Sequence, residues 1–309
     1  MPERKGDAYD YYIAGNEDTD LFEKIFLVDD IVEEICKPDK YFLIGEKGSG
    51  KTAYSVYMSK SDKINSFCSI SLVENTLYQR FLNMKRQKAL ELSSFKDVWI
   101  NLIYLILAEK IRKEYGETFF SSIKYKQLSK AIDVFYSDAF KPEFVNAFEF
   151  VDNASASINS MMKQGLFSTG TKASAETSQK YVEQSFQISL LKIRDGFEKA
   201  FMSVNLKKPT ILFVDGIDAR PRDIDNEQYF ECLVGLVNAV LEMNQSFLKE
   251  KQIKIMLLIR PDIMYKMPVH NMNQKLRNNS VLLNWVTSYR KYIDSKLFKI
   301  ADDYFMKQQ

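Results

Sequence analysis

A glycine-rich segment, residues 45–52, constrains the fold of this chain more than any other feature. Its sequence, Gly-Glu-Lys-Gly-Ser-Gly-Lys-Thr, fits the pattern G-x-x-x-x-G-K-[ST]. It follows an apolar run at 41–44, typical of a buried strand, and precedes an expected helix at 53–59. Glycines allow the sharp turn and let backbone N–H groups approach phosphate closely, and the helix adds its positive N-terminal end. We therefore expect a phosphate-binding loop in an α/β fold.

The residue types of this loop suit a nucleoside triphosphate and its metal ion. Lys51 supplies a mobile positive charge for the β- and γ-phosphates, so we expect it to serve catalysis as well as binding. The Thr52 hydroxyl is a hard oxygen ligand for Mg²⁺. The nucleotide contacts are expected from Gly45, Glu46, Lys47, Gly48, Ser49, Gly50, Lys51, Thr52 and Ala53.

An acidic residue at the end of a second apolar strand should complete the site. Residues 210–215, Thr-Ile-Leu-Phe-Val-Asp, form a continuous apolar run that is typical of a central parallel strand. We expect Asp215 to hold the metal shell. Asp218, three positions further, is the best candidate to orient or deprotonate the attacking water, and the alternative is a carboxylate that only stabilises the turn.

Three arginines are candidates for contacts with the γ-phosphate. Arg260 ends another apolar strand, and the carboxyl ends of parallel strands face a bound ligand together. It could therefore sense the γ-phosphate, or it could form a structural salt bridge. Arg220 and Arg222 follow the Asp215 strand and could reach a neighbouring subunit's nucleotide, although a solvated loop is the simpler interpretation.

Two weaker patterns each have an ordinary alternative. Phe22, Ile25 and Phe26 precede the first strand and could wall an adenine base, or they could belong to the core. The basic cluster at 85–88 could touch a nucleic-acid backbone, but a solvated helical face is the safer interpretation.

The remaining pattern alternates strands with long helices. This order predicts a parallel sheet with helices on both faces. Further strands are expected at 65–71, 253–259 and 281–283, and helices at 31–35, 95–115, 182–203, 227–249 and 285–305.

One region interrupts this alternation. Residues 117–183 contain a Ser- and Thr-rich stretch at 168–178 that has no apolar periodicity. We expect a helical insertion with a mobile loop, which either carries partner contacts or is structural padding. The expected domains are therefore a discontinuous nucleotide-binding domain, 1–116 with 184–309, and the insertion 117–183.

Composition excludes several classes of protein. The 309 residues carry 43 basic and 41 acidic side chains, for a net charge of +2, which argues against a dedicated nucleic-acid binder. Three distant cysteines and a single histidine, His270, offer no metal-ligand spacing. The longest apolar stretch, 98–108, is too short to span a bilayer, so we expect no membrane contact. Two of the cysteines, Cys68 and Cys232, lie in apolar runs as small core residues would, and we expect a reducing, cytoplasmic compartment.

The two nucleotide motifs together resemble those of the STAND and KAP-like P-loop ATPases of bacteria. The resemblance rests on the 45–52 loop and on the sequence Val-Asp-Gly-Ile-Asp at 214–218, in which the second acid is displaced from the first. Looser similarities are Trp99, the Leu-Leu-Ile-Arg-Pro-Asp sequence at 257–262, and Trp285.

This resemblance implies a three-layer P-loop NTPase fold with a five-stranded parallel sheet in the order 5-1-4-3-2. It also implies ATP and Mg²⁺, with hydrolysis or exchange acting as a switch, often in modules that defend against phage. Ala219 stands where these proteins usually have Glu, so we expect slow hydrolysis.

The leading hypothesis is a regulatory ATPase that acts through self-association or through a protein partner on a separate chain. An alternative is a nucleic-acid-associated motor or loader, which would need a basic channel. A small-molecule kinase ranks lowest, because the 168–178 stretch has no arginine to serve in a lid.

Overall fold

The fold is taken from a computed structural model of the chain. It describes residues 8, 22, 26–73, 95–120, 125–138, 190–218, 226–267, 276–284, 293 and 295–306. The chain forms two compact units. The first, here called the sheet unit, comprises 1–72, 207–218 and 252–309, and the second, the helical unit, comprises 73–206 and 219–251.

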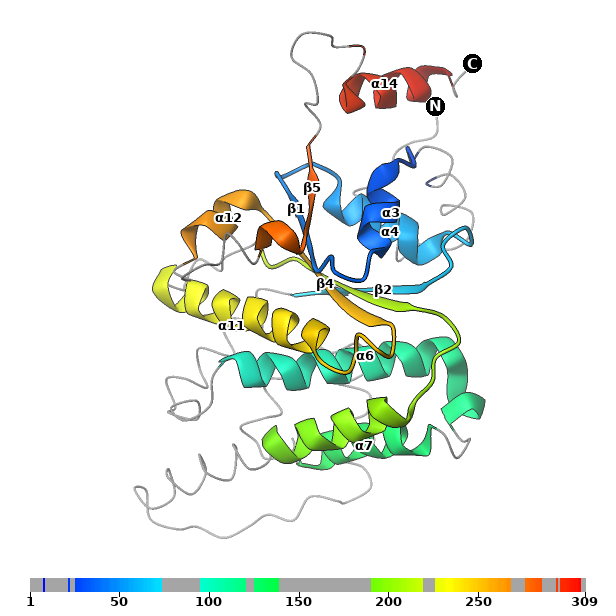
Figure 1. Ribbon diagram of the computed structural model, residues 1–309, viewed down its shortest axis with the longest axis vertical. Helices are drawn as coiled ribbons and strands as arrows, with labels where there is room; N and C mark the ends of the chain where they lie inside the picture. Colours follow the sequence, from blue (N-terminus) through cyan, green and yellow to red (C-terminus); the bar gives the residue numbers. More distant parts are fainter. Residues whose placement is uncertain are drawn as a thin grey trace, which may run out of the picture. The chain divides into compact units, whose positions relative to one another are not determined.

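A single all-parallel sheet forms the centre of the sheet unit (Figure 1). Its order is β2-β3-β4-β1-β5, which is 5-1-4-3-2 when it is counted from the opposite edge. The five-stranded parallel sheet of an α/β fold is therefore confirmed. The strands are β1 Phe42–Gly45, β2 Phe67–Leu72, β3 Thr210–Asp215, β4 Ile253–Ile259 and β5 Ser280–Leu283.

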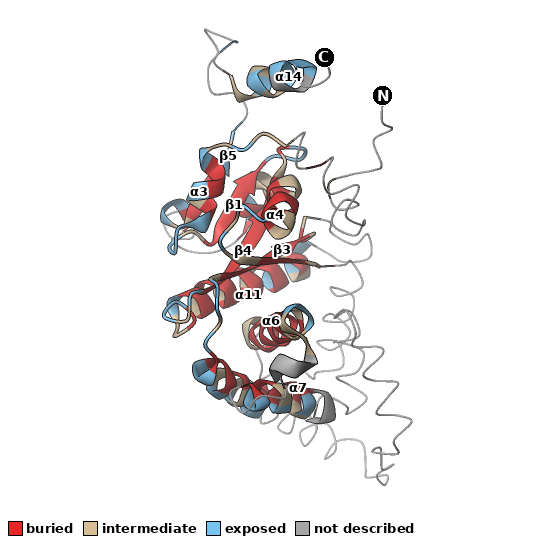
Figure 2. Ribbon diagram, turned by 90° about the vertical axis from the view of Figure 1, so that its right-hand side faces the viewer, coloured by how far each residue is buried: buried red, intermediate tan, exposed pale blue. Residues whose placement is uncertain are grey.

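The inner strands are buried along their whole length. Every residue of β1, β3 and β4 is buried, as the continuous apolar runs in the sequence predicted (Figure 2). In the register of the sheet, Leu72 lies beside Asp215 and Ile44 beside Ile259. The carboxyl ends of these strands therefore share one edge, and the 45–52 loop leaves the sheet from that edge.

Two helices of the sheet unit pack against the sheet, α3 Asp30–Cys36 and α4 Lys51–Lys60 (Figure 1). Their apolar residues, such as Ile35 and Val56, form one core cluster with Leu43, Phe213 and Leu258 of the strands. The buried Lys254 of β4 closes the C-terminal end of α3, since its Nζ donates to the carbonyls of Ile35 and Lys37.

Two short helices follow the last two strands, and the sequence predicted their positions less well than those of the strands. Helix α12, Pro261–Lys266, comes directly after β4 and was not predicted. Helix α14, Lys296–Met306, begins eleven residues after the predicted start at 285. Ser295 lies in a bend and accepts a hydrogen bond from the Phe298 N–H at 3.2 Å, which caps α14, so the predicted helix is not continuous at Ser295.

The helical unit contains α6 Phe95–Phe120, α7 Lys126–Asp138 and α11 Asn226–Gln245, with a further helical stretch at 190–203. Gly116 interrupts α6 with a φ of 74°, at the position where the sequence predicted the helix to stop. Helix α11 ends at Gln245, four residues before its predicted end, and a series of turns follows.

Helices α6 and α11 approach each other closely. A Cβ atom on Gly235 of α11 would lie 2.6 Å from the Phe95 Cβ and 3.0 Å from the Lys96 nitrogen, so this glycine has a packing role. The fully buried Trp99 of α6 donates its Nε1–H to the Cys232 carbonyl of α11 at 3.1 Å. Trp99 thus serves the packing of two helices.

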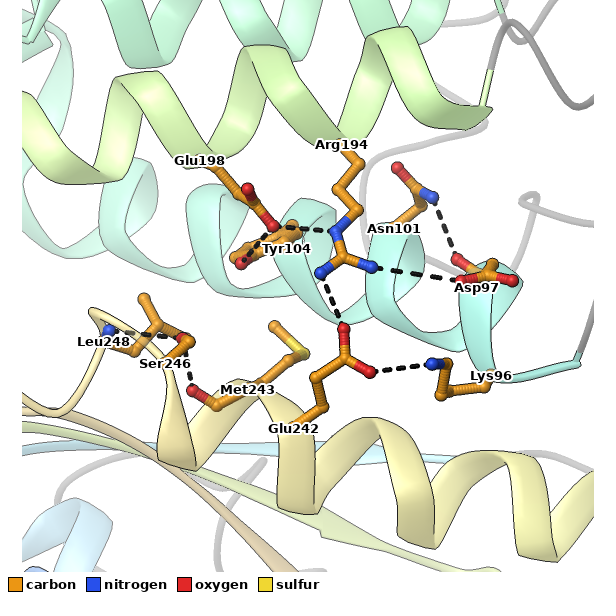
Figure 3. Close-up of polar contacts among 10 residues, drawn as sticks. All are labelled: Lys96, Asp97, Asn101, Tyr104, Arg194, Glu198, Glu242, Met243, Ser246 and Leu248. Atoms are coloured by element: carbon orange, nitrogen blue, oxygen red, sulfur yellow. Dashed lines mark hydrogen bonds and ion pairs between the residues drawn. The ribbon is translucent and has the colours of Figure 1, made fainter.

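A cluster of charged side chains joins three helices of this unit (Figure 3). Arg194 donates to Glu198 and to Glu242 of α11 at 2.7 Å each, and lies 3.9 Å from Asp97 of α6. Lys96 donates to the other oxygen of Glu242 at 2.8 Å. These five residues are called the helix-joining cluster below.

Candidate functional site

The 45–52 loop has the backbone geometry that its glycines suggest. Gly48 and Gly50 have φ angles of 81° and 87°, which other residues adopt only with strain. A Cβ atom on Gly45 would collide with the Ser49 hydroxyl and lie 3.0 Å from the Leu283 Cβ. Gly50 caps α4 without a side chain, so the backbone N–H groups of the first helical turn are left for an anion.

The Lys51 side chain folds back over this loop. Its Nζ donates to the carbonyls of Gly45 at 2.8 Å and Glu46 at 3.2 Å, and lies 3.8 Å from Asp218 Oδ2. Lys51 is only 7% exposed, while Glu46 and Lys47 on the outer side of the loop are exposed. The ammonium group is therefore held inside the curve of the loop, where an anion bound by the loop would meet it.

Thr52 and Asp215, the two predicted metal ligands, lie in direct contact. The Thr52 hydroxyl donates to Asp215 Oδ2 at 2.6 Å, although the residues are 163 positions apart. The other oxygen of Asp215 accepts the Gly216 N–H at 2.7 Å. The contact forms because α4 begins, and β3 ends, at the same edge of the sheet.

These two side chains fit a Mg²⁺ ion chemically, since a hydroxyl and a carboxylate are the hard oxygen ligands it prefers. No cluster of three or more His, Cys, Asp or Glu side chains suited to a metal occurs among the described residues. A magnesium ion that keeps several waters and binds phosphate oxygens needs no such cluster.

Asp218 is half-buried, and its Oδ2 lies 3.8 Å from the Lys51 ammonium group. Burial raises the pKa of its carboxyl to about 6, and the charge of Asp215 adds to this, while Lys51 and Arg260 oppose it. Within the described part of the chain, Asp218 Oδ1 is buried without a hydrogen-bond partner. A carboxylate with this pKa can accept a proton near neutral pH, as a general base must.

Arg260 forms the structural salt bridge that was its alternative interpretation. One of its terminal nitrogens lies 2.7 Å from Asp262 Oδ2, two residues further along the chain. Its Nε is buried and has no hydrogen-bond partner among the residues described. Arg260 also lies near enough to Asp218 to lower the pKa of that carboxyl. A contact with the γ-phosphate stays a prediction.

A pocket that the sequence did not reveal lies beside the loop. Ser49 lines it together with Asp29, Tyr54 and Lys296. Asp29 is the N-cap of α3, and its Oδ1 accepts the Ile31 N–H. An aspartate just before the first apolar residues of a helix is a sequence signal that could have identified it. Lys296 lies 267 positions from Asp29, and no local pattern connects the two.

Two of the three residues that could wall an adenine base pack in or against the core. Phe22 is buried in the core cluster, and the Phe26 ring stacks on Tyr57 at 4.4 Å between centroids. This packing favours the interpretation as core residues, and a contact with a base stays a prediction.

Several predicted features lie outside the described residues. These are Ile25, the basic cluster at 85–88, the stretch at 168–178, Ala219, Arg220, Arg222, His270 and Trp285. The boundaries of the insertion at 117 and 183 also stay predictions.

Comparisons add no further constraint on this site. None of the helices that the structure describes is long and apolar enough to cross a membrane. A search of protein families, of curated proteins and of solved structures finds nothing that matches this chain.

Proposed function

We propose that this chain is a P-loop ATPase with a three-layer fold that binds ATP and Mg²⁺ through its 45–52 loop and hydrolyses ATP slowly. The observation that carries the proposal is the contact of Thr52 with Asp215 at 2.6 Å, beside the enclosed ammonium group of Lys51. The glycine-rich loop, a cation and two hard oxygen ligands thus meet at the carboxyl edge of a parallel sheet, where such sheets bind ligands.

Each residue has a defined task in this proposal. The loop N–H groups bind phosphate oxygens, and Lys51 exchanges the carbonyls of Gly45 and Glu46 for the β- and γ-phosphates. Thr52 and Asp215 would hold Mg²⁺, which neutralises charge on the phosphate oxygens when it is bound. Asp218 orients the attacking water and accepts its proton.

The biological role rests on the resemblance to STAND and KAP-like ATPases. We propose a regulatory switch that works through self-association or a protein partner, in a setting such as bacterial antiphage defence. Slow turnover follows from Ala219, which stands where those proteins usually have Glu. An arginine from a neighbouring copy, Arg220 or Arg222, would then raise the rate.

Calorimetry with ATP and Mg²⁺ tests the nucleotide site. Lys51→Ala should weaken ATP binding by about 100-fold or more, because it removes the only charge that the loop encloses. Lys63→Ala is the matched control, since Lys63 is exposed on the turn after α4. Equal ATP affinity in wild type and Lys51→Ala would show that the site is assigned wrongly.

A further inference from the structure

The pocket beside the 45–52 loop has two kinds of wall. It is partly open to solvent. Ser49 of the loop lines it, and Asp29 and Lys296 supply charged groups. The apolar side chains that line it are Leu27, Ile31, Leu283 and Ile300.

Asp29 connects three helices around this pocket. Its Oδ1 caps α3 and also accepts the hydroxyl of Tyr54, on α4, at 2.9 Å. Its Oδ2 accepts Nζ of Lys296, the first residue of α14, at 2.8 Å. The Asp29 side chain is 14% exposed, so this ion pair is shielded from solvent better than a surface pair.

Lys296 holds a second carboxylate as well. Its Nζ lies 3.0 Å from Asp30, whose side chain is 77% exposed. Burial opposes the charge of Lys296, but the hydrogen bonds and charges of Asp29 and Asp30 outweigh it and raise the lysine's pKa. Ion pairs at the wall of the pocket therefore join the first residue of α14 to the start of α3.

We propose that this pocket binds the nucleoside part of the nucleotide, and that α14 is its lid, latched by Lys296 to Asp29. The inference rests on the proposed function, since the loop must bind the phosphates of the same molecule. Four aliphatic side chains suit the faces of a base, and a few polar groups suit its edges and the ribose hydroxyls. Ile300 and Lys296, one helical turn apart on α14, supply part of this wall.

A coupling between ligand and helix follows from this arrangement. A nucleoside in the pocket gains contacts with α14 only when the latch is closed, so it must favour the closed position. By reciprocity, opening the latch must weaken nucleoside binding by the same factor. Inorganic tripolyphosphate, which has no nucleoside, should bind the loop without affecting α14.

Hydrogen exchange of the amides in 296–306 tests the lid directly. With Mg²⁺ present, ATP should slow exchange in α14 by about fivefold or more, because binding must be broken before the helix opens. Tripolyphosphate at a saturating concentration should leave these amides within about twofold of the free protein. Equal protection by both ligands, or by neither, would overturn the proposal.

Variants of the latch test it by affinity. Lys296→Ala should weaken ATP binding about fivefold to twentyfold and change tripolyphosphate binding less than about twofold. Asp29→Asn should do the same, because asparagine keeps the cap of α3 and only the charge is lost. Lys296→Arg should retain ATP affinity, because its guanidinium can still bridge two carboxylates. Lys299→Ala, exposed on α14, is the matched control.

The outcomes separate this inference from the proposed function. If ATP and tripolyphosphate both bind and both are lost in Lys51→Ala, the nucleotide site stands. In that case, equal weakening of the two ligands by Lys296→Ala would refute the lid alone. If wild type binds neither ligand, both proposals fail together.

Discussion

Charged side chains gather in both units of the chain, but their charges are balanced in different ways. In the helix-joining cluster, burial opposes the charges of Arg194 and Glu242. The hydrogen bonds between partners outweigh it, so the pKa of Arg194 is raised and the pKa of Glu242 is lowered. Both groups therefore stay ionised. Figure 3 shows how their contacts join the helices.

The balance falls the other way at the carboxyl edge of the sheet. Burial prevails at Asp218 and raises its pKa to about 6, although Lys51 and Arg260 oppose this. Buried polar atoms of Asp218 and Arg260 also have no hydrogen-bond partner within the described residues. Satisfied polar atoms are expected of a cluster that only supports a fold. Unsatisfied buried polar atoms and a raised carboxyl pKa are the features expected of a cluster that would bind a ligand, as we propose for this edge of the sheet.

The largest expected effect is on turnover, when one carboxylate in each unit is replaced by its amide. Asp218→Asn should lower the ATPase kcat about 100-fold or more, because an amide cannot accept the proton of water. ATP affinity should stay within about threefold, since Asp218 has no expected role in binding. Glu242→Gln should leave kcat unchanged and lower the urea midpoint instead.

Steady-state kinetics and calorimetry on the same preparations measure both effects. The pH profile adds a second readout, since wild-type kcat should fall as the pH is lowered through about 6, the pKa of Asp218. Equal turnover in wild type and Asp218→Asn would remove Asp218 from the mechanism.

The next largest effect concerns Arg194. Arg194→Met should lower the free energy of unfolding by about 2–3 kcal/mol, because it leaves Glu198 and Glu242 without their shared partner. Lys199→Met, which breaks an exposed pair with Asp195, should cost less than about 0.5 kcal/mol. Urea denaturation measures both. Similar costs for the two variants would mean that the helix-joining cluster behaves as an ordinary surface network.

A smaller effect of opposite sign is expected for Asp218. Its folded pKa of about 6 lies above the unfolded value of 3.8, so the wild type loses stability as the pH rises through this window. The asparagine of Asp218→Asn does not titrate. The free energy of unfolding of this variant, relative to wild type, should therefore be about 1–2 kcal/mol higher at pH 7.5 than at pH 4. Urea denaturation of the nucleotide-free proteins at both pH values measures this gain, and a constant difference would contradict it.

Much of the sheet unit follows from short-range patterns. The strands β3 and β4 coincide with the predicted ranges because each is a continuous apolar run that is buried throughout. The 45–52 loop is recognisable because its glycines, lysine and threonine occupy fixed positions. The parallel sheet then brings Thr52 and Asp215 together, since the carboxyl ends of its strands share one edge.

The parts that sequence missed depend on single capping residues or on distant contacts. Helix α14 begins at its Ser295 cap, whereas apolar spacing alone extended the predicted helix back to Trp285. The pocket needs Asp29, Tyr54 and Lys296 to meet, and their spacing in the chain carries no signal for it. The helix-joining cluster is likewise assembled from three separate helices.

The smallest expected effect tests whether this cluster acts as a unit. Lys96 and Glu242 are each about one third exposed, so Lys96→Met should cost only about 0.5–1 kcal/mol of unfolding free energy. In the Arg194→Met background the same change should cost about 0.5–1 kcal/mol more, because Glu242 then loses both cations that it contacts in the described part of the chain. A double-mutant cycle by urea denaturation, with each variant also measured at high salt to screen the pair, determines this coupling. Strictly additive costs would mean that Lys96 and Arg194 act on Glu242 independently, and the contrast with Asp218 would then rest on Arg194 alone.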